Sequence, residues 1–191
     1  MGRLLVLALV VLALPLVTST AVPAAPRAPR TVFHYGDSLT VGTGRYLSSF
    51  LPGWSITESA SVGRHADEAP SAVQSLSASL PRVLVISLGA NDDPGAVTAF
   101  AKDVRRIVTT AGRNRCIIWS TVVRPPYNGV SYDGYNRVLR QIATMNSNLR
   151  VFDWQALAAT HPRWFGSDDV HPTADGYRVR AAALAKLVKS C

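Results

Sequence analysis

The stretch RVLVISLGA at residues 82–90 limits the fold more than any other part of the sequence. It is almost wholly apolar, so a strand formed from it needs cover on both of its faces. Runs of this kind are typical of central strands in parallel sheets, which carry helices on both sides. CIIWSTVV at 116–123 has the same character. These two runs therefore predict a buried parallel sheet.

Segments of strand and helix character alternate along the rest of the chain. Further strands are predicted at 31–35, 54–60 and 149–154, and helices at 39–50, 68–80, 95–111, 132–145 and 173–188. This alternation predicts an α/β fold, a three-layer α/β/α sandwich around a mainly parallel sheet. In such folds the active site lies beyond the carboxyl ends of the strands.

The N-terminus has the layout of a secretory signal peptide. A short positive start at Arg3 precedes an apolar run at 4–17, and small residues follow at Ser19 and Ala21. The run is shorter than the roughly 20 residues of a membrane span, so we expect no stable span; an uncleaved anchor is the alternative. We expect a signal peptide at 1–21, a Pro/Ala/Arg linker at 22–30 and one domain at 31–191, secreted or associated with the cell envelope.

The formal net charge of +8 is compatible with three kinds of partner: nucleic acid, an anionic wall polymer or a membrane surface. However, the basic residues are scattered, with no run of five or more. We therefore predict an ordinary basic surface and no nucleic-acid partner. The sequence does not indicate an oligomeric state.

Both cysteines, Cys116 and Cys191, lie in the part of the chain that we expect to be exported. In an oxidising compartment an even number of cysteines permits one disulfide. Two free thiols are the alternative, because sequence spacing does not show proximity.

Polar clusters follow the first three predicted strands. Ser38, in GDS, is a candidate nucleophile at a strand–helix turn. The alternative is that Asp37 or Ser38 simply caps the helix that follows. Gly63, in SVGR, either presents an amide donor to a ligand or is a plain turn residue. Asn91, in GAND, either donates to an oxyanion or caps the helix that begins near Pro94.

His171 is the strongest candidate for a catalytic base. Asp168 lies three residues before it and can orient its ring, whereas the competing acid, Asp169, has a less suitable spacing. A metal site shared with His161 is disfavoured because no further ligands occur at matching spacing. His34 and His65 are predicted to be structural or surface residues, with a place in the cleft as the alternative for His65.

The ordered set of these residues resembles the SGNH hydrolase (GDSL-type esterase/lipase) superfamily. The matching segments are GDSLT at 36–40, Gly63, GAND at 89–92 and DDVH at 168–171. The resemblance implies a flavodoxin-like sandwich with a five-stranded parallel sheet. It also implies Ser38 as nucleophile, His171 as base and Asp168 as its partner, with an oxyanion hole formed by the Ser38 and Gly63 amides and the Asn91 side chain.

A finer resemblance links the chain to the extracellular SGNH domains of peptidoglycan O-acetyltransferases. It is carried by residues 62–64, 89–92, 119–125 and 151–154, together with Asn136. The predicted function is a secreted serine esterase acting on short acyl or acetyl esters of a small molecule or glycan. The alternatives are an O-acyltransferase acting on cell-wall glycan and, disfavoured by the intact residue set, an inactive wall-binding module. No metal or organic cofactor is implied.

Overall fold

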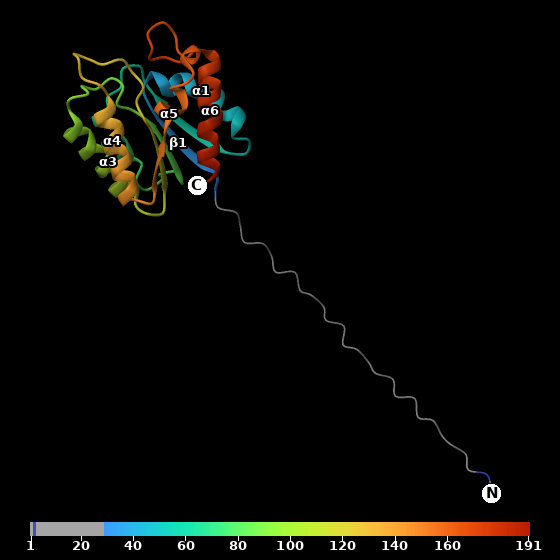
Figure 1. The fold of residues 1–191 in the computed structure, drawn as a ribbon. Helices are drawn as coiled ribbons and strands as arrows, with labels where there is room; N and C mark the ends of the chain where they lie inside the picture. The colour runs from blue at the N-terminus through green and yellow to red at the C-terminus, as the bar shows by residue number, and fades with distance from the viewer. Residues whose placement is uncertain (1, 3–28) are drawn as a thin grey trace.

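The computed structural model describes residue 2 and residues 29–191 (Figure 1). The expected signal peptide at 1–21, apart from residue 2, and most of the expected linker at 22–30 lie outside the described residues. Over the described residues, no helix combines the length and the apolar character that a membrane crossing requires.

Five parallel strands form one sheet in the order β2-β1-β3-β4-β5. They are β1 (Thr31–Gly36), β2 (Ser55–Ala60), β3 (Val83–Ser87), β4 (Cys116–Ser120) and β5 (Leu149–Phe152). The central strand β3 is buried along its whole length, as its apolar sequence predicts. The strand order reverses direction between β1 and β3, which is where α/β sheets of this kind bind ligands.

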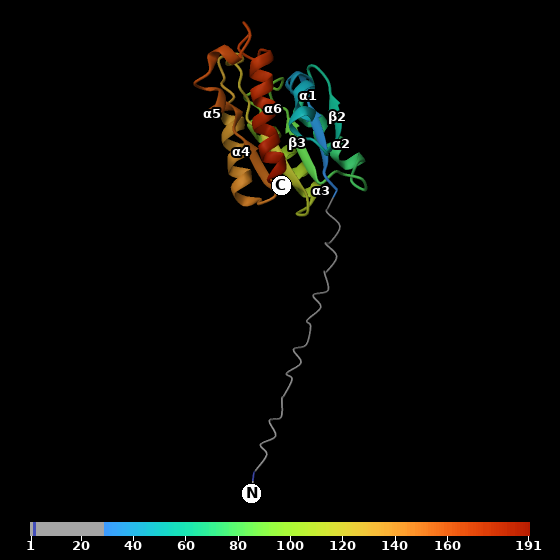
Figure 2. The same cartoon turned by 90° about the vertical axis from the view of Figure 1, so that its right-hand side faces the viewer.

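Helices cover both faces of the sheet and complete three layers (Figures 1 and 2). On one face α1 (Ser38–Phe50) packs against α6 (Ala174–Lys189). On the other face α3 (Val97–Ala111) lies between α2 (Ala69–Ser75) and α4 (Asp133–Met145). A hydrophobic core fills the space on each side of the sheet. The predicted α/β sandwich with a five-stranded parallel sheet is therefore confirmed.

Some element boundaries differ from the predicted ones. Helix α2 ends at Ser75 rather than residue 80, because the amides of Ser77 and Ser79 form turns with carbonyls three residues earlier. The short helix α5 (Trp154–Ala158) replaces the predicted end of the last strand. Its start is set by Asp153, whose carboxylate accepts a hydrogen bond from the Ala156 amide.

The end of the sheet at which the strands finish (the carboxyl edge) differs from the end at which they begin (the amino edge). The loops after β1, β2 and β3 bring the predicted polar clusters to the carboxyl edge. At the amino edge a disulfide joins Cys116, the first residue of β4, to Cys191 after α6. Of the two alternatives that the sequence left open for the cysteines, the structure has the bonded one.

Candidate active site

Ser38 is the first residue of α1, directly after the turn that ends β1. Asp37 caps this helix, since its carboxylate accepts a hydrogen bond from the Leu39 amide at 2.9 Å. Gly36 fits here because a Cβ at this position would lie 2.3 Å from the Ser87 carbonyl oxygen. Ser38 is therefore not the cap, and its hydroxyl is left for another contact.

That contact is with His171, which lies in the loop before α6. Ser38 Oγ is 2.8 Å from His171 Nε2, and His171 Nδ1 is 2.6 Å from Asp168 Oδ2. The second oxygen of Asp168 accepts hydrogen bonds from the amides of Val170 and His171, both at 3.0 Å. The bond from the His171 ring, followed by these amides, holds the pKa of Asp168 well below its ordinary value. The structure thus places Asp168, rather than the competing Asp169, against the ring.

The loop that carries this pair is held at both ends. The Gly166 amide donates to the His171 carbonyl at 2.8 Å, and Phe165 and Pro172 form a short antiparallel bridge. Thr173 then caps α6 by accepting a hydrogen bond from the Gly176 amide. These backbone contacts fix the position of His171 relative to α1.

Gly63 lies in the turn that follows β2 and lines the same cleft as Ser38. Its φ of +77° is in the left-handed region that favours glycine. Within the described part of the chain, the amides of Ser38 and Gly63 have no hydrogen-bond acceptor. Both residues that line the cleft therefore have an unoccupied backbone donor.

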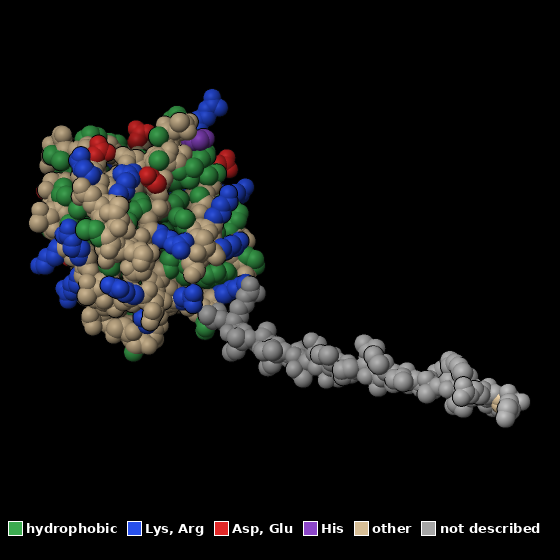
Figure 3. All heavy atoms as spheres, turned by 60° about the horizontal axis from the view of Figure 1, so that its bottom comes forward, with side chains coloured by type: hydrophobic (Ala, Val, Ile, Leu, Met, Phe, Trp, Pro, Cys, Tyr) green, Lys and Arg blue, Asp and Glu red, His purple; other side chains and the backbone are tan. Residues whose placement is uncertain are grey.

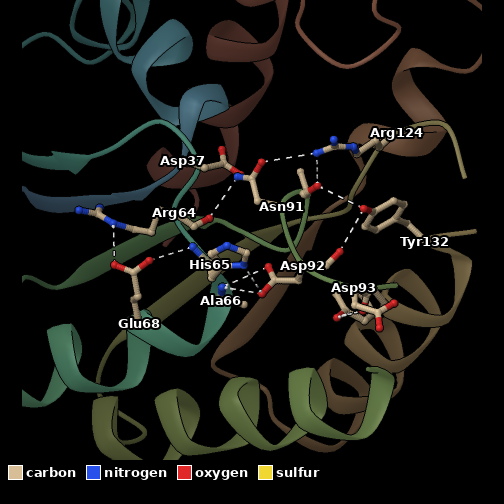
Figure 4. Close-up of polar contacts among 12 residues, drawn as sticks. Asp37, Arg64, His65, Ala66, Glu68, Asn91, Asp92, Asp93, Arg124 and Tyr132 are labelled. Atoms are coloured by element: carbon tan, nitrogen blue, oxygen red, sulfur yellow. Dashed lines mark hydrogen bonds and ion pairs between the residues drawn. The ribbon is translucent and has the colours of Figure 1, made fainter. Parts of the chain in front are cut away.

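Asn91 lies in the loop after β3, where several polar contacts surround it (Figure 4). Its amide nitrogen is 3.1 Å from the Arg64 carbonyl oxygen and 3.4 Å from Asp37 Oδ2. Arg124 donates to its Oδ1 at 3.4 Å. Because a guanidinium only donates, this contact orients the Asn91 nitrogen toward Asp37 and Arg64. The capping alternative for Asn91 is wrong, since the residue that precedes α3 is Ala96.

Two side chains outside the set of predicted site residues support this loop. Arg124, after β4, also donates to the Ala90 carbonyl. The Tyr132 hydroxyl donates to the carbonyls of Ala90 and Asp92 at 3.3 and 3.1 Å. Neither residue stands in a polar cluster after one of the first three strands, so their role appears only once the chain is folded.

Asp92 joins the loop after β3 to the loop after β2. Its carboxylate accepts a hydrogen bond from the Ala66 amide, with both oxygens at 3.1 Å, and lies 3.3 Å from His65 Nδ1. Its position next to Asn91 in GAND is the sequence signal that could have revealed this role. His65 therefore bonds to Asp92 and is absent from the lining of the cleft.

The other two histidines lie elsewhere. His34 is buried and its Nδ1 is 2.9 Å from Glu58 Oε2; burial lowers the pKa of His34. The His161 ring stacks on Trp164 with 3.9 Å between centroids. The environment of His34 is structural, as the sequence predicts, and His161 packs against an aromatic ring.

The cleft above Ser38 is open and has a volume of about 400 Å³. Apolar side chains form its rim: Val62 and Tyr127 line it and are 76% and 51% exposed. Tyr127 is presented by a tight turn in which Asn128 and Gly129 both have positive φ. The cleft can therefore accept a small group next to Ser38 while a larger group contacts the rim.

A buried pair of charged residues lies beneath this site. Asp37 is fully buried, and burial raises the pKa of its carboxyl to about 6, against opposition from the Leu39 amide and the charge of Arg180. Arg180 is also fully buried and donates to the hydroxyls of Thr43, Ser87 and Ser120. Burial lowers the pKa of Arg180 to about 10.

A model of the GDSL-like lipase/acylhydrolase family matches residues 34–179. The O-acetyltransferase OatA of Staphylococcus aureus (strain NCTC 8325 / PS 47) is 26% identical over 159 residues, which cover 81% of this chain but 24% of that protein. The chain therefore spans about a quarter of the length of this curated relative.

Solved structures are also similar. The C-terminal catalytic domain of Streptococcus pneumoniae peptidoglycan O-acetyltransferase A matches with a TM-score of 0.70 and 23% identity, over 85% of this chain and 94% of that one. The psychrotrophic esterase EstA of Pseudoalteromonas sp. matches with a TM-score of 0.65 and 17% identity, over 84% and 97% of the two chains. At these identities the two structures support the fold alone.

Proposed function

Because the chain belongs to the GDSL-like lipase/acylhydrolase family, we propose that it is a serine esterase that hydrolyses short acyl esters at Ser38. The observation that carries this proposal is the continuous line of contacts from Ser38 Oγ to His171 and on to Asp168, at 2.8 and 2.6 Å. A binding module has no need of such a line, which argues against the inactive alternative.

In the first half of the reaction, His171 Nε2 removes the Ser38 proton as Oγ attacks the ester carbonyl carbon. The carbonyl oxygen becomes an oxyanion in a tetrahedral intermediate. The intermediate collapses as the bond to the alcohol oxygen breaks, and His171 gives its proton to the departing alcohol. Asp168, ionised because of its lowered pKa, stabilises the positive charge that His171 carries in between.

In the second half a water molecule replaces the alcohol. His171 removes a proton from the water, the resulting hydroxide attacks the acyl carbon, and the second tetrahedral intermediate collapses. The bond to Ser38 Oγ breaks, Oγ takes back the proton from His171, and the free acid leaves. The enzyme returns to its starting state with no cofactor consumed.

The oxyanion donors in this proposal are the amides of Ser38 and Gly63 and the side chain of Asn91. The two backbone amides are unoccupied among the described residues, whereas the Asn91 nitrogen is bonded to Arg64 and Asp37. The oxyanion must therefore replace one of these two acceptors. The longer contact, to Asp37, is the one that we expect to be replaced. The Asn91 nitrogen then donates to the full negative charge of the oxyanion, and the acceptor that it leaves is a carboxyl whose raised pKa makes it easy to protonate.

Acyl transfer to cell-wall glycan is the second candidate. It is favoured by the similarity to the S. aureus O-acetyltransferase, which covers 81% of this chain. Hydrolysis and transfer share the acyl-enzyme on Ser38 and differ only in whether water or a sugar hydroxyl attacks it. We further propose that residues 1–21 act as a signal peptide and that the domain works outside the cytoplasm.

The test is labelling of the purified protein with a serine-directed fluorophosphonate. We expect one label on Ser38, its loss in Ser38→Ala, and turnover of small acetyl esters that disappears in the same variant. Ser61→Ala, on an exposed serine outside the cleft lining, is the matched control and should keep both. A folded protein with neither label nor turnover would refute the proposal that the chain is a serine enzyme.

A second measurement separates the two candidates. A soluble glycan acceptor is added with the acetyl ester, and both free acetate and acetylated glycan are measured. Free acetate alone at every acceptor concentration supports the esterase. Acetylated glycan that increases with acceptor, and is lost in Ser38→Ala, supports the transferase.

A further inference from the structure

The amino edge of the sheet, at the end opposite the cleft, carries basic residues from several separate parts of the chain. The strands begin and the helices end here, so this end contains 29–31, 75–83, 109–117, 143–150 and 186–191. These segments contain no acidic residue, and their basic residues include Arg30, Arg82, Arg113, Arg115, Arg150 and Lys189. We call this surface the basic end.

The acidic residues lie away from the basic end. In the described chain, all of them except Glu58 and Asp103 lie in the loops after the strands or in the first turns of the helices, around the cleft. Glu58 and Asp103 lie partway along β2 and α3. Figure 3 brings the bottom of the molecule forward: Lys and Arg side chains spread over it, and the acidic side chains in view lie along its upper part. The acidic residues are thus absent from the basic end, whereas basic residues such as Arg64 and Arg124 also occur at the cleft end.

The basic end is hollowed rather than flat. A hollow of about 460 Å³ is lined by Arg82, Arg113, Arg115 and Arg150. A second, of about 540 Å³, shares Arg113 with it, and a third, of about 420 Å³, shares Arg82 and Arg115. The shared residues make the three hollows neighbours along one surface.

The positive charges in these hollows are not neutralised by acidic side chains. None of these arginines forms an ion pair within the described residues. Arg115 supports the fold by donating to the carbonyls of Leu80 and Ala111, and Arg150 donates to Ser190 Oγ. Arg82 makes one contact of 3.5 Å, to the main-chain oxygen of Cys191, and both Arg82 and Arg113 are exposed. Their guanidinium groups are therefore available to a ligand.

We propose that the basic end binds a phosphodiester polymer, which lies along the three hollows with its phosphates on the arginines. The planar guanidinium fork matches the oxygens of a phosphate group. A flat anionic bilayer fits this surface less well, because the surface is concave and its exposed large apolar side chain, among those described, is Met145 alone. This site is distinct from the one proposed around Ser38, and a polymer bound here leaves the cleft open.

The experiment measures binding of the full chain to a soluble phosphodiester polymer, poly(glycerol phosphate), as a function of salt. The test variant is Arg82→Gln/Arg113→Gln. The control variant, Arg105→Gln/Arg137→Gln, removes the same charge from exposed positions on α3 and α4. We expect the test variant to bind at least about tenfold more weakly and the slope of log K against log salt to fall by about 2, while the control stays close to wild type. Turnover of small acetyl esters should be the same in all three proteins.

Two comparison ligands make the result specific. Polyglutamate with the same number of charges tests whether carboxylates suffice, and vesicles containing anionic lipid test the bilayer. Tighter binding of poly(glycerol phosphate) than of either, lost only in the test variant, supports the proposal. Equal loss in the test and control variants means that net charge alone drives binding and overturns it. Preference for polyglutamate or for vesicles overturns it as well.

Discussion

The buried carboxyl of Asp37 leads to a prediction about stability and pH. Its pKa is raised by burial from 3.8 to about 6. A carboxyl with a higher pKa in the folded chain than in the unfolded chain destabilises the fold when it ionises, so stability is lost as the pH rises from about 4 through about 6. The two pKa values correspond to a cost of about 3 kcal/mol, present in full above both of them.

The substitution that isolates this cost is Asp37→Asn. Asparagine keeps an oxygen that can accept from the Leu39 amide, but it has no proton to lose. Its amide nitrogen faces that of Asn91, which lies 3.4 Å from Asp37 Oδ2, and this adds a cost that does not depend on pH. The quantity to follow is therefore the difference in unfolding free energy between variant and wild type. Between about pH 3.5 and about pH 7.5 it should move by nearly 3 kcal/mol in favour of the variant.

The assay is urea unfolding followed by tryptophan fluorescence at several pH values. Asp153→Asn is the control, because the pKa of Asp153 is shifted in the opposite direction. Burial acts to raise this pKa, but hydrogen bonds led by the one from Arg140 lower it overall. The ionised Asp153 carboxylate stabilises the fold at pH values above its pKa in the unfolded chain, and this contribution is lost in acid. The variant should therefore be less stable than wild type at neutral pH. A difference for Asp37→Asn that stays constant across the pH range would refute the reasoning.

Further predictions concern the cleft and the disulfide. Asn91→Ala should lower kcat for a small acetyl ester by about a hundredfold or more with an unchanged circular dichroism spectrum, because it removes one oxyanion donor. Asp168→Asn should lower kcat by about 10⁴-fold, whereas Asp169→Asn should leave it nearly unchanged; equal effects would contradict the assignment of Asp168 as the partner of His171. Replacing both Cys116 and Cys191 by serine should lower the free energy of unfolding by about 4 kcal/mol in denaturant titrations, since the bond spans 75 residues; no change in the midpoint would contradict this.

Much of the fold and the site arrangement could be predicted because both depend on where strands end. The apolar runs at 82–90 and 116–123 identify buried parallel strands, and parallel strands bring their following loops to one edge. This is why Ser38, Gly63 and Asn91 line one cleft although they are far apart in the sequence.

The supporting contacts were not predictable in the same way. Arg124 and Tyr132 reach the loop after β3 from positions more than 30 residues later in the chain. Their partners there are carbonyl groups, which every residue has and no sequence pattern marks. The basic end could not be predicted for a related reason. Its arginines come from separate segments, and only Arg113 and Arg115 stand close together in the sequence, so no run of charge marks this surface.

The buried charges beneath Ser38 bear on how the proposed site is held in place. Both Asp37 and Arg180 have pKa values displaced in the direction that burial dictates, to about 6 and about 10, so both are less stable as ions here than in water. A fold that is optimised for stability alone has no reason to keep two such groups, and costs of this kind tend to gather at functional sites. What they provide is position: Asp37 fixes the first turn of α1, and Arg180 ties α6 to hydroxyls on α1, β3 and β4. Because Ser38 begins α1 and His171 precedes α6, these buried contacts hold the two halves of the proposed catalytic pair at their 2.8 Å separation.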